Sequence, residues 1–296
     1  AITLPSLTGN INERTWNTQR KALYSRMSQA VALMPALNGY GIGATEDETK
    51  ENAAETFLSA GLSKVLKINN ICDSDHLQDC GLPSKIIQMG GKSNISPLPQ
   101  SLFTFNSAFN FSPTEAGVKV FSYSQLDTNA AAFETANGEA ILVYYYPFCK
   151  NSMNELSGYY VQPKLCANFV YDLNGKKGPN TVGKDVGFIT AFYPVDPVVV
   201  SPLPLAKDIS GSYLNNAQVN IGKICRNFDS ESKAPNKEEL MALFVNKKLI
   251  NIDENYYWSS TPIYEKVNYA WRLSFDFGYM YGASRTDGGW LRCINR

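Results

Sequence analysis

The sequence predicts an α+β protein, in which a long N-terminal helix packs on an antiparallel β-sheet and a second α+β module follows. Three observations predict this class. Apolar residues recur at three- and four-residue spacing near the N-terminus. Four runs rich in β-branched and aromatic residues follow, each bounded by turn residues. A proline-rich stretch then separates these runs from a further helix and several short strands.

The first helix is predicted over residues 10–34. Its apolar positions form one stripe of an amphipathic helix: Trp16, Leu23, Met27, Ala30, Val31 and Met34. Pro35 is expected to end it, because proline has no N–H to donate to the carbonyl four residues earlier in the preceding turn. A second helix is expected over residues 46–66, where acidic residues gather in the first turns, as the helix dipole prefers.

The strand-like runs lie at residues 118–123, 139–146, 166–173 and 185–193. Residues 90–113 are rich in Gly, Ser, Asn and Pro and are expected to be irregular. The stretch "YPVDPVVVSPLP" at residues 193–204 contains four prolines and is the best candidate for a linker. We therefore predict two domains, at residues 1–200 and 205–296.

In the second domain, a segment at residues 212–226 is expected to be helical or irregular. A clear helix is predicted after Asn236, which is a suitable N-cap with Glu239 as its capping-box partner. Its buried face comprises Leu240, Leu243 and Phe244. Short strands are expected near residues 256–259, 270–275, 279–281 and 290–293, and their aromatic side chains are expected to form a core: Trp258, Trp271, Phe275 and Trp290.

Composition narrows the classes of function. The formal net charge is zero, so nothing indicates a nucleic-acid partner. The six cysteines fall into three sequence-local pairs and predict three disulfides in an oxidising compartment: Cys72 with Cys80, Cys149 with Cys166, and Cys225 with Cys293. Zinc is the alternative, but CxxC spacing is absent and the single histidine, His76, has no partner motif. No apolar run is long enough to span a membrane.

The loop "DLNGKKGPNTVGKD" is a candidate calcium site. Asp172, Asn174, Asn180 and Asp185 offer hard oxygen ligands, and the glycines between them allow tight turns. The loop is not an EF-hand, because it lacks the bidentate glutamate and carries Lys176 and Lys177. The alternative is a tight turn stabilised by its Asp and Asn side chains. No other cofactor is expected.

The first part of the chain resembles type IV pilins and type II secretion pseudopilins. The segment "AITLPSLTGNINERTWNTQRKALYSRMSQAV" is similar to the continuation of the pilin helix beyond its membrane-embedded half, and "YDLNGKKGPNTVGKDVGF" is similar to a motif of pilin-like proteins. The resemblance covers residues 1–195. It implies a helix on a four-stranded antiparallel sheet, assembly with other subunits, and a membrane helix preceding this sequence.

The last part, residues 210–296, resembles C-type-lectin-like modules related to the formylglycine-generating enzyme fold. The matching segments are "NKEEL", "YYWSST", "AWRLSFDFG" and "WLRCIN". The resemblance implies that Cys225 pairs with Cys293. Four tyrosines are candidates for an exposed ligand-binding face, because Tyr offers contact area at low entropic cost: Tyr264, Tyr269, Tyr279 and Tyr281.

These resemblances imply a minor pilin or pseudopilin-like subunit at the cell surface, membrane-anchored in its full-length precursor. Its partners would be other pilin subunits and a surface protein or glycan. A soluble or surface-anchored lectin-like protein is the alternative, although "APN" at 234–236 lies in the wrong place for a sugar-binding calcium motif. A formylglycine-generating-type enzyme is disfavoured, because no extra cysteine remains in the module and one histidine argues against a catalytic triad. No catalytic residue is predicted.

Overall fold

The structure is a computed structural model that describes residues 4–38, 52–91, 93–103, 129–146, 164–193, 200–202, 212–214, 221–228, 230–263, 266, 268–276, 278 and 280–295. The chain divides into two compact units. The first comprises residues 1–102, 124–149 and 166–202, and the second comprises residues 103–123, 150–165 and 203–296. The structure is mixed α+β with an antiparallel sheet, as predicted.

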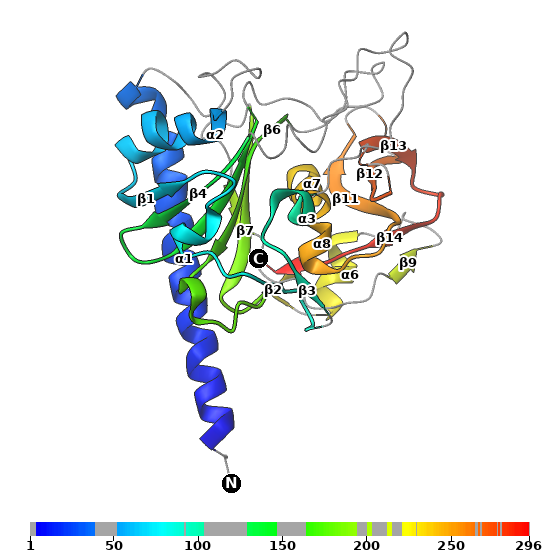
Figure 1. Cartoon of the computed structure of the whole chain (residues 1–296). Coiled ribbons are helices and arrows are strands. Elements are labelled where there is room, and N and C mark those ends of the chain that lie inside the picture. The colour runs from blue at the N-terminus through cyan, green and yellow to red at the C-terminus, as the bar shows by residue number, and fades with distance from the viewer. Residues whose placement is uncertain are drawn as a thin grey trace. The chain divides into compact units, whose positions relative to one another are not determined.

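The first unit is built on α1 (Leu4–Asn38), a helix of 35 residues. The predicted stripe is confirmed: its last five members, Leu23, Met27, Ala30, Val31 and Met34, are each at most 2 % exposed, and Trp16 packs against the same core. The predicted end at Pro35 is wrong, because the helix continues to Asn38. Proline has a φ suited to a helix and removes one hydrogen bond, so the last turn tolerates it. The N-terminal part of α1 projects beyond the sheet (Figure 1).

The sheet of the first unit has six strands in the order β1-β4-β5-β6-β7-β8. Their bounds are β1 (Ile68–Cys72), β4 (Ala130–Thr135), β5 (Ala140–Tyr145), β6 (Lys164–Asp172), β7 (Val186–Tyr193) and β8 (Val200–Pro202). Side chains alternate between the two faces of each strand. Ile141, Val143 and Tyr145 of β5 therefore share the face that packs against α1. Three of the four predicted strands are confirmed, and the fourth, at 118–123, lies outside the described residues.

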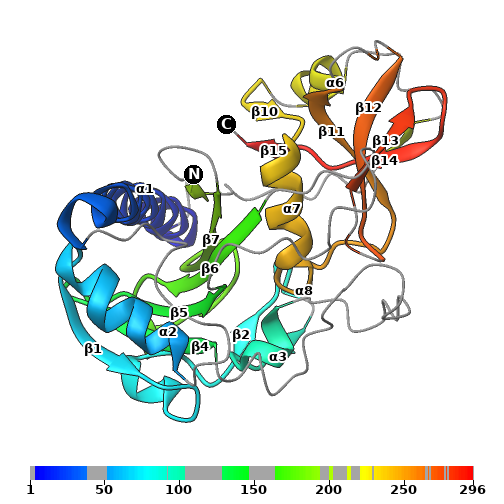
Figure 2. The same cartoon turned by 90° about the horizontal axis from the view of Figure 1, so that it is seen from above.

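The second predicted helix is shorter and less regular than expected. Helical structure runs through α2 (Ala53–Thr56), the π-helical turn η1 (Phe57–Gly61) and the 3-10 turn η2 (Leu62–Lys64). Phe57 stacks on Tyr145 with ring centroids 4.3 Å apart. This segment therefore covers the same face of the sheet as α1 (Figure 2).

Short elements follow this helical segment. They are η3 (Leu77–Cys80), β2 (Ile86–Ile87), β3 (Asn94–Ile95) and α3 (Pro99–Leu102). The expectation of irregular structure over 90–113 is therefore wrong for β3 and α3, and residues 104–113 lie outside the described residues.

Part of the predicted linker belongs to the sheet. Residues 200–202 form β8, which pairs antiparallel with β7 through Ile189–Pro202, Thr190–Ser201 and Ala191–Val200. Pro202 is compatible with this position because β8 is an edge strand, where one N–H need not enter the ladder. The linker therefore cannot extend over the whole of residues 193–204. The predicted boundary between domains at residues 1–200 and 205–296 stays a prediction.

The second unit contains a five-stranded sheet in the order β13-β12-β11-β14-β9. Its strands are β9 (Ser212–Leu214), β11 (Tyr256–Pro262), β12 (Tyr269–Ser274), β13 (Met280–Ser284) and β14 (Gly289–Leu291), and β11 pairs parallel with β14. Its helices are α6 (Ile221–Phe228), α7 (Lys237–Val245) and α8 (Lys247–Ile250), and a small ladder joins β10 (Ser232–Lys233) to β15 (Ile294–Asn295).

The predicted capping box begins α7. The side chain of Asn236 accepts from the Glu239 N–H at 2.8 Å, and Glu239 Oε2 accepts from the Asn236 N–H at 2.9 Å. The predicted aromatic core is confirmed in part. Trp258 and Phe275 are fully buried, whereas Trp271 and Trp290 are half-buried.

Two predicted disulfides are confirmed, Cys72–Cys80 and Cys225–Cys293. Cys166 is also disulfide-bonded, and its predicted partner Cys149 lies outside the described residues. Disulfides are compatible with an extracellular location. Among the described helices, none combines the length and the apolar character needed to cross a bilayer.

Candidate functional site

The loop between β6 and β7 is held closed at its base. The Leu173 N–H donates to the Asp185 carbonyl at 2.9 Å, which brings the two ends of the loop together. Between them, Gly175, Gly178, Asn180 and Gly183 have positive φ values of 62°, 69°, 50° and 98°. Three of these are glycines, which adopt this backbone without a steric cost, and asparagine tolerates it better than most residues. The predicted glycine-dependent turns are therefore present.

Three other elements hold the loop in place. Arg20 of α1 donates to the carbonyls of Lys184 at 2.6 Å and Gly183 at 3.3 Å. Ile87 of β2 donates to the Asn180 carbonyl and accepts from the Val182 N–H. Gly175 lies so close to the chain after Cys80 that a Cβ there would come within 3.2 Å of the Gly81 carbonyl oxygen. The loop is thus hydrogen-bonded to α1 and β2, and it lies close to the chain just after the Cys72–Cys80 disulfide.

Both aspartates of the predicted set are buried. Asp172 is 1 % exposed and Asp185 is fully buried. Asp185 accepts from two backbone amides, that of Asn180 through Oδ2 and that of Thr181 through Oδ1, both at 2.9 Å. Asp172 accepts from the Asn174 amide through Oδ1 at 3.1 Å. Asp172 therefore holds the backbone directly after β6, at Asn174. Asp185 holds the backbone before β7, at Asn180 and Thr181.

The two carboxylates influence each other. Burial raises the pKa of Asp172 to about 7, and the negative charge of Asp185 also raises it, while the backbone amides of Asn174 and Gly175 partly offset these effects. A carboxylate that is removed from water beside a second carboxylate requires a compensating positive charge or a proton. Asp172 therefore binds a proton more readily than an ordinary aspartate.

Three buried oxygens of the loop have no hydrogen-bond partner: Asp172 Oδ2, Asn174 Oδ1 and Asn180 Oδ1. Buried polar atoms in folded proteins are nearly always paired, so a cluster of orphaned atoms needs an explanation. The orientation of the Asn174 amide is fixed, because its Nδ2 donates to the Gly178 carbonyl at 3.0 Å. The orphaned atoms are all acceptors, and they come from three of the four residues predicted to bind calcium.

This donor set consists of carboxylate and amide oxygens, which are the ligands of hard cations such as Ca²⁺. Within the described ranges, no three side chains of His, Cys, Asp or Glu gather as a metal cluster. The loop has only two carboxylates and completes its donors with asparagine amides. Zinc, which prefers nitrogen and sulfur ligands, does not fit these donors.

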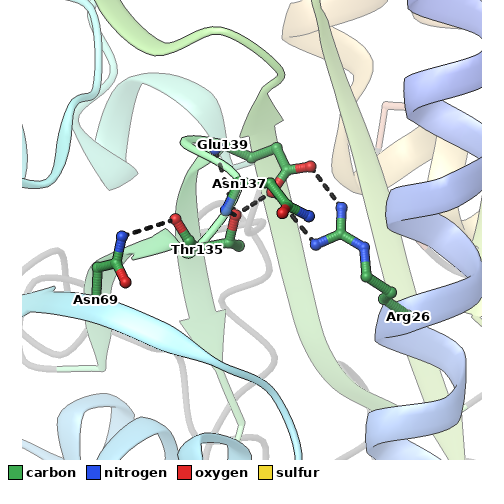
Figure 3. A network of polar contacts seen from close by, with 5 residues as sticks. All are labelled: Arg26, Asn69, Thr135, Asn137 and Glu139. Carbon is green, nitrogen blue, oxygen red and sulfur yellow. Dashed lines mark hydrogen bonds and ion pairs between the residues drawn. The ribbon is translucent and has the colours of Figure 1, made fainter.

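The sequence did not predict the arginine contacts of α1. Arg20 binds the loop, and six residues further on Arg26 forms an ion pair with the buried Glu139 at 2.5 Å (Figure 3). Glu139 also contacts the Thr135 hydroxyl, and Asn69 donates to the Thr135 carbonyl at 3.3 Å. Both arginines lie beside the apolar stripe of α1, so the sequence indicated that they were near the sheet. It did not indicate their partners, which lie more than 100 residues away in the sequence.

The predicted tyrosine face is described only in part. Tyr269 is 39 % exposed, and Lys266 Nζ lies 5.3 Å from its ring centroid. Tyr281 is half-buried against the core and its hydroxyl is bonded to Arg272. Tyr264 and Tyr279 lie outside the described residues. A ligand-binding role for these tyrosines stays a prediction.

Arg272 lies among three aromatic side chains of the second unit, Tyr256, Trp258 and Tyr281. Its guanidinium lies 4.8 Å, 5.3 Å and 5.0 Å from the ring centroids of Tyr256, Trp258 and Tyr281, and it donates to the Gly288 carbonyl at 2.6 Å. Contacts of this kind between a cation and aromatic rings stabilise the pair when water is excluded. The arginine therefore ties β11, β12 and β13 together with the turn before β14.

Comparison with known proteins gives no match: no family model, no curated protein and no solved structure is significantly similar to this chain.

Proposed function

We propose that this chain is a minor pilin or pseudopilin-like subunit of a surface filament or secretion apparatus, with a C-terminal module for adhesion or recognition. One observation carries the proposal. A 35-residue helix buries one stripe on an antiparallel sheet, exposes the opposite side and extends past the sheet at its N-terminal end (Figure 1). A helix of this design has surface left for neighbouring subunits.

The exposed side of α1 supports this role. Lys21, Ala22, Ser25, Gln29 and Ala32 are exposed, and Leu33 is 49 % exposed. Three of these residues, Ala22, Ser25 and Ala32, are small enough for a second helix to approach closely, and Leu33 would add apolar contact area. The partners proposed for this side are other pilin-like subunits.

The second unit is proposed to meet a surface protein or glycan. It contains the disulfide between the buried Cys225 and Cys293, and Tyr269 of β12 is exposed at its sheet. We propose a role in binding and assembly, without turnover. His76, the single histidine of the chain, is exposed and paired with Asp73 at 2.7 Å, which raises the pKa of His76.

The coding sequence upstream of Ala1 tests this proposal. We expect a short basic leader and a cleavage site, followed by about 20 apolar residues that continue into α1 as one helix. Mass spectrometry of the mature protein from its native cells would identify the processed N-terminus. An ordinary secretory signal peptide that ends directly before Ala1 would contradict the proposal.

A further inference from the structure

We infer that Asn137, in the turn between β4 and β5, converts spontaneously to aspartate and isoaspartate, and that Arg26 of α1 assists the reaction. This inference is independent of the proposed function, because it rests on the chemistry of one turn. An asparagine side chain reacts most readily when glycine follows it, since glycine has no Cβ to hinder the approach of its backbone nitrogen. Three such pairs occur in the sequence, at residues 38–39, 137–138 and 174–175.

The reaction requires only the chain itself and water. The backbone nitrogen of Gly138 loses its proton to hydroxide and attacks Cγ of Asn137. The side-chain amide then takes a proton from water and leaves as ammonia, which closes a five-membered cyclic imide. Water adds to one of the two imide carbonyls and opens the ring, giving aspartate in one case and isoaspartate in the other. Nothing is oxidised or reduced.

The turn leaves room for this reaction. Asn137 is exposed, Gly138 is partly exposed with a φ of 85°, and a Cβ at Gly138 would have no atom within 4 Å. The Gly138 N–H donates to the Thr135 carbonyl at 2.9 Å. This bond must open before the nitrogen can attack, and opening requires little free energy in an exposed turn.

Arg26 supplies electrostatic assistance. The Asn137 side chain points toward the Arg26 guanidinium (Figure 3). Its amide oxygen faces α1, because the amide nitrogen would meet only donors there, and this oxygen accepts from Arg26 Nη1 at 2.6 Å and Nη2 at 3.2 Å. Attack on Cγ places negative charge on the same oxygen, and a guanidinium already in contact stabilises that charge. The ion pair with Glu139 at 2.5 Å holds the guanidinium in position.

Asn174 is the matched comparison, because Gly175 follows it. Asn174 is half-buried, and its Nδ2, which would be the leaving group, donates to the Gly178 carbonyl at 3.0 Å. Its Oδ1 has no hydrogen-bond partner, so no cation assists an attack there. We therefore expect Asn174 to react more slowly than Asn137 in the folded chain.

The modification falls at the contact between α1 and the sheet. Both products carry a carboxylate at residue 137, and this carboxylate competes with Glu139 for Arg26. Isoaspartate also adds one carbon to the main chain of a turn whose ends are joined by the Thr135 N–H and the Glu139 carbonyl at 2.9 Å. The polar contact of α1 with this turn therefore changes as the protein ages.

The test is incubation of the full chain at pH 8, with peptide mass spectrometry at intervals. We expect the mass gain of deamidation at Asn137 at least tenfold faster than at Asn174. In urea, where the chain is unfolded, the two sites should react at similar rates, because glycine follows both. If Asn137 stays unmodified, or reacts no faster than Asn174 in the folded chain, the inference is overturned.

Variants test the role of Arg26, each at a temperature where circular dichroism shows it to be folded. Arg26→Met should slow the reaction at Asn137 several-fold and leave Asn174 unchanged, and Arg26→Lys should restore part of the rate. Lys21→Met, at an exposed position of the same helix, should change neither site. If Arg26→Met leaves the reaction at Asn137 unchanged or accelerates it, the guanidinium does not assist, and that part of the inference is refuted.

Discussion

Replacing Trp258 by alanine is expected to destabilise the second unit by about 3–5 kcal/mol. Trp258 is fully buried, and its indole packs so tightly on β14 that a Cβ at Gly289 would lie 2.4 Å from the ring nitrogen. The guanidinium of Arg272 lies over the same ring at 5.3 Å. Alanine would leave a large cavity and remove one wall of the group that holds Arg272. Urea unfolding followed by far-ultraviolet circular dichroism would measure the loss.

Trp271→Ala provides the matched comparison. Trp271 is half-buried, with Lys237 Nζ 5.3 Å from its ring centroid. Its replacement should cost only about 1–2 kcal/mol, because part of the ring already contacts water. Equal losses for the two tryptophans would show that Trp258 is not the centre of this core.

Replacing Arg26 by methionine is expected to destabilise the first unit by about 2 kcal/mol. The side chain of Glu139 is 7 % exposed, and without Arg26 its charge would lose its ion-pair partner. Breaking a fully buried ion pair typically costs about 3–5 kcal/mol, and we expect less here because Arg26 is 30 % exposed and solvent screens the pair. Thermal unfolding of the full chain would measure the change.

A double-mutant cycle isolates this ion pair. Arg26→Met with Glu139→Met should be less destabilising than the sum of the two single changes, because no uncompensated charge is left behind. Lys21→Met, at an exposed position of the same helix, should change stability by less than about 0.5 kcal/mol. Additive effects of the two single changes would mean that the pair contributes nothing to the docking of α1.

The helices and the strands with local signals could be predicted from the sequence. The stripe of α1 is a pattern within one helix, and the capping box of α7 spans four residues. Both can therefore be recognised from the local sequence alone. Pro35 misled the prediction, because the helix continues for three residues beyond it, so that the hydrogen bond it cannot donate is lost only in the last turn.

Strands that depend on their neighbours could not be predicted. Residues 130–135 of β4, "AAAFET", begin with three alanines, which are depleted in strands. They form a strand because β1 and β5 pair with them on either side. Likewise β8 lies in a proline-rich segment and is defined by its pairing with β7. Contacts between distant segments determine both elements.

The four candidate ligand residues of the loop could be predicted from the sequence, but the contacts and burial around them could not. The four oxygen-bearing residues lie within one loop of the sequence and were therefore recognisable. The burial of Asp172, its raised pKa and the orphaned oxygens arise only when the loop folds against α1 and β2. Arg20 was missed because its partners, Gly183 and Lys184, lie 163 and 164 residues away.

Photo-cross-linking at Leu33 tests most directly whether the exposed side of α1 meets other subunits. A photoreactive amino acid would replace Leu33, which is 49 % exposed, in the full-length precursor expressed in its native cells. Leu98, also a leucine of the first unit and 41 % exposed, is the matched control. We predict cross-links from position 33 to the first helix of other pilin-like subunits, and none from position 98. Equal labelling from both positions, or a protein recovered free of any such subunit, would contradict the account.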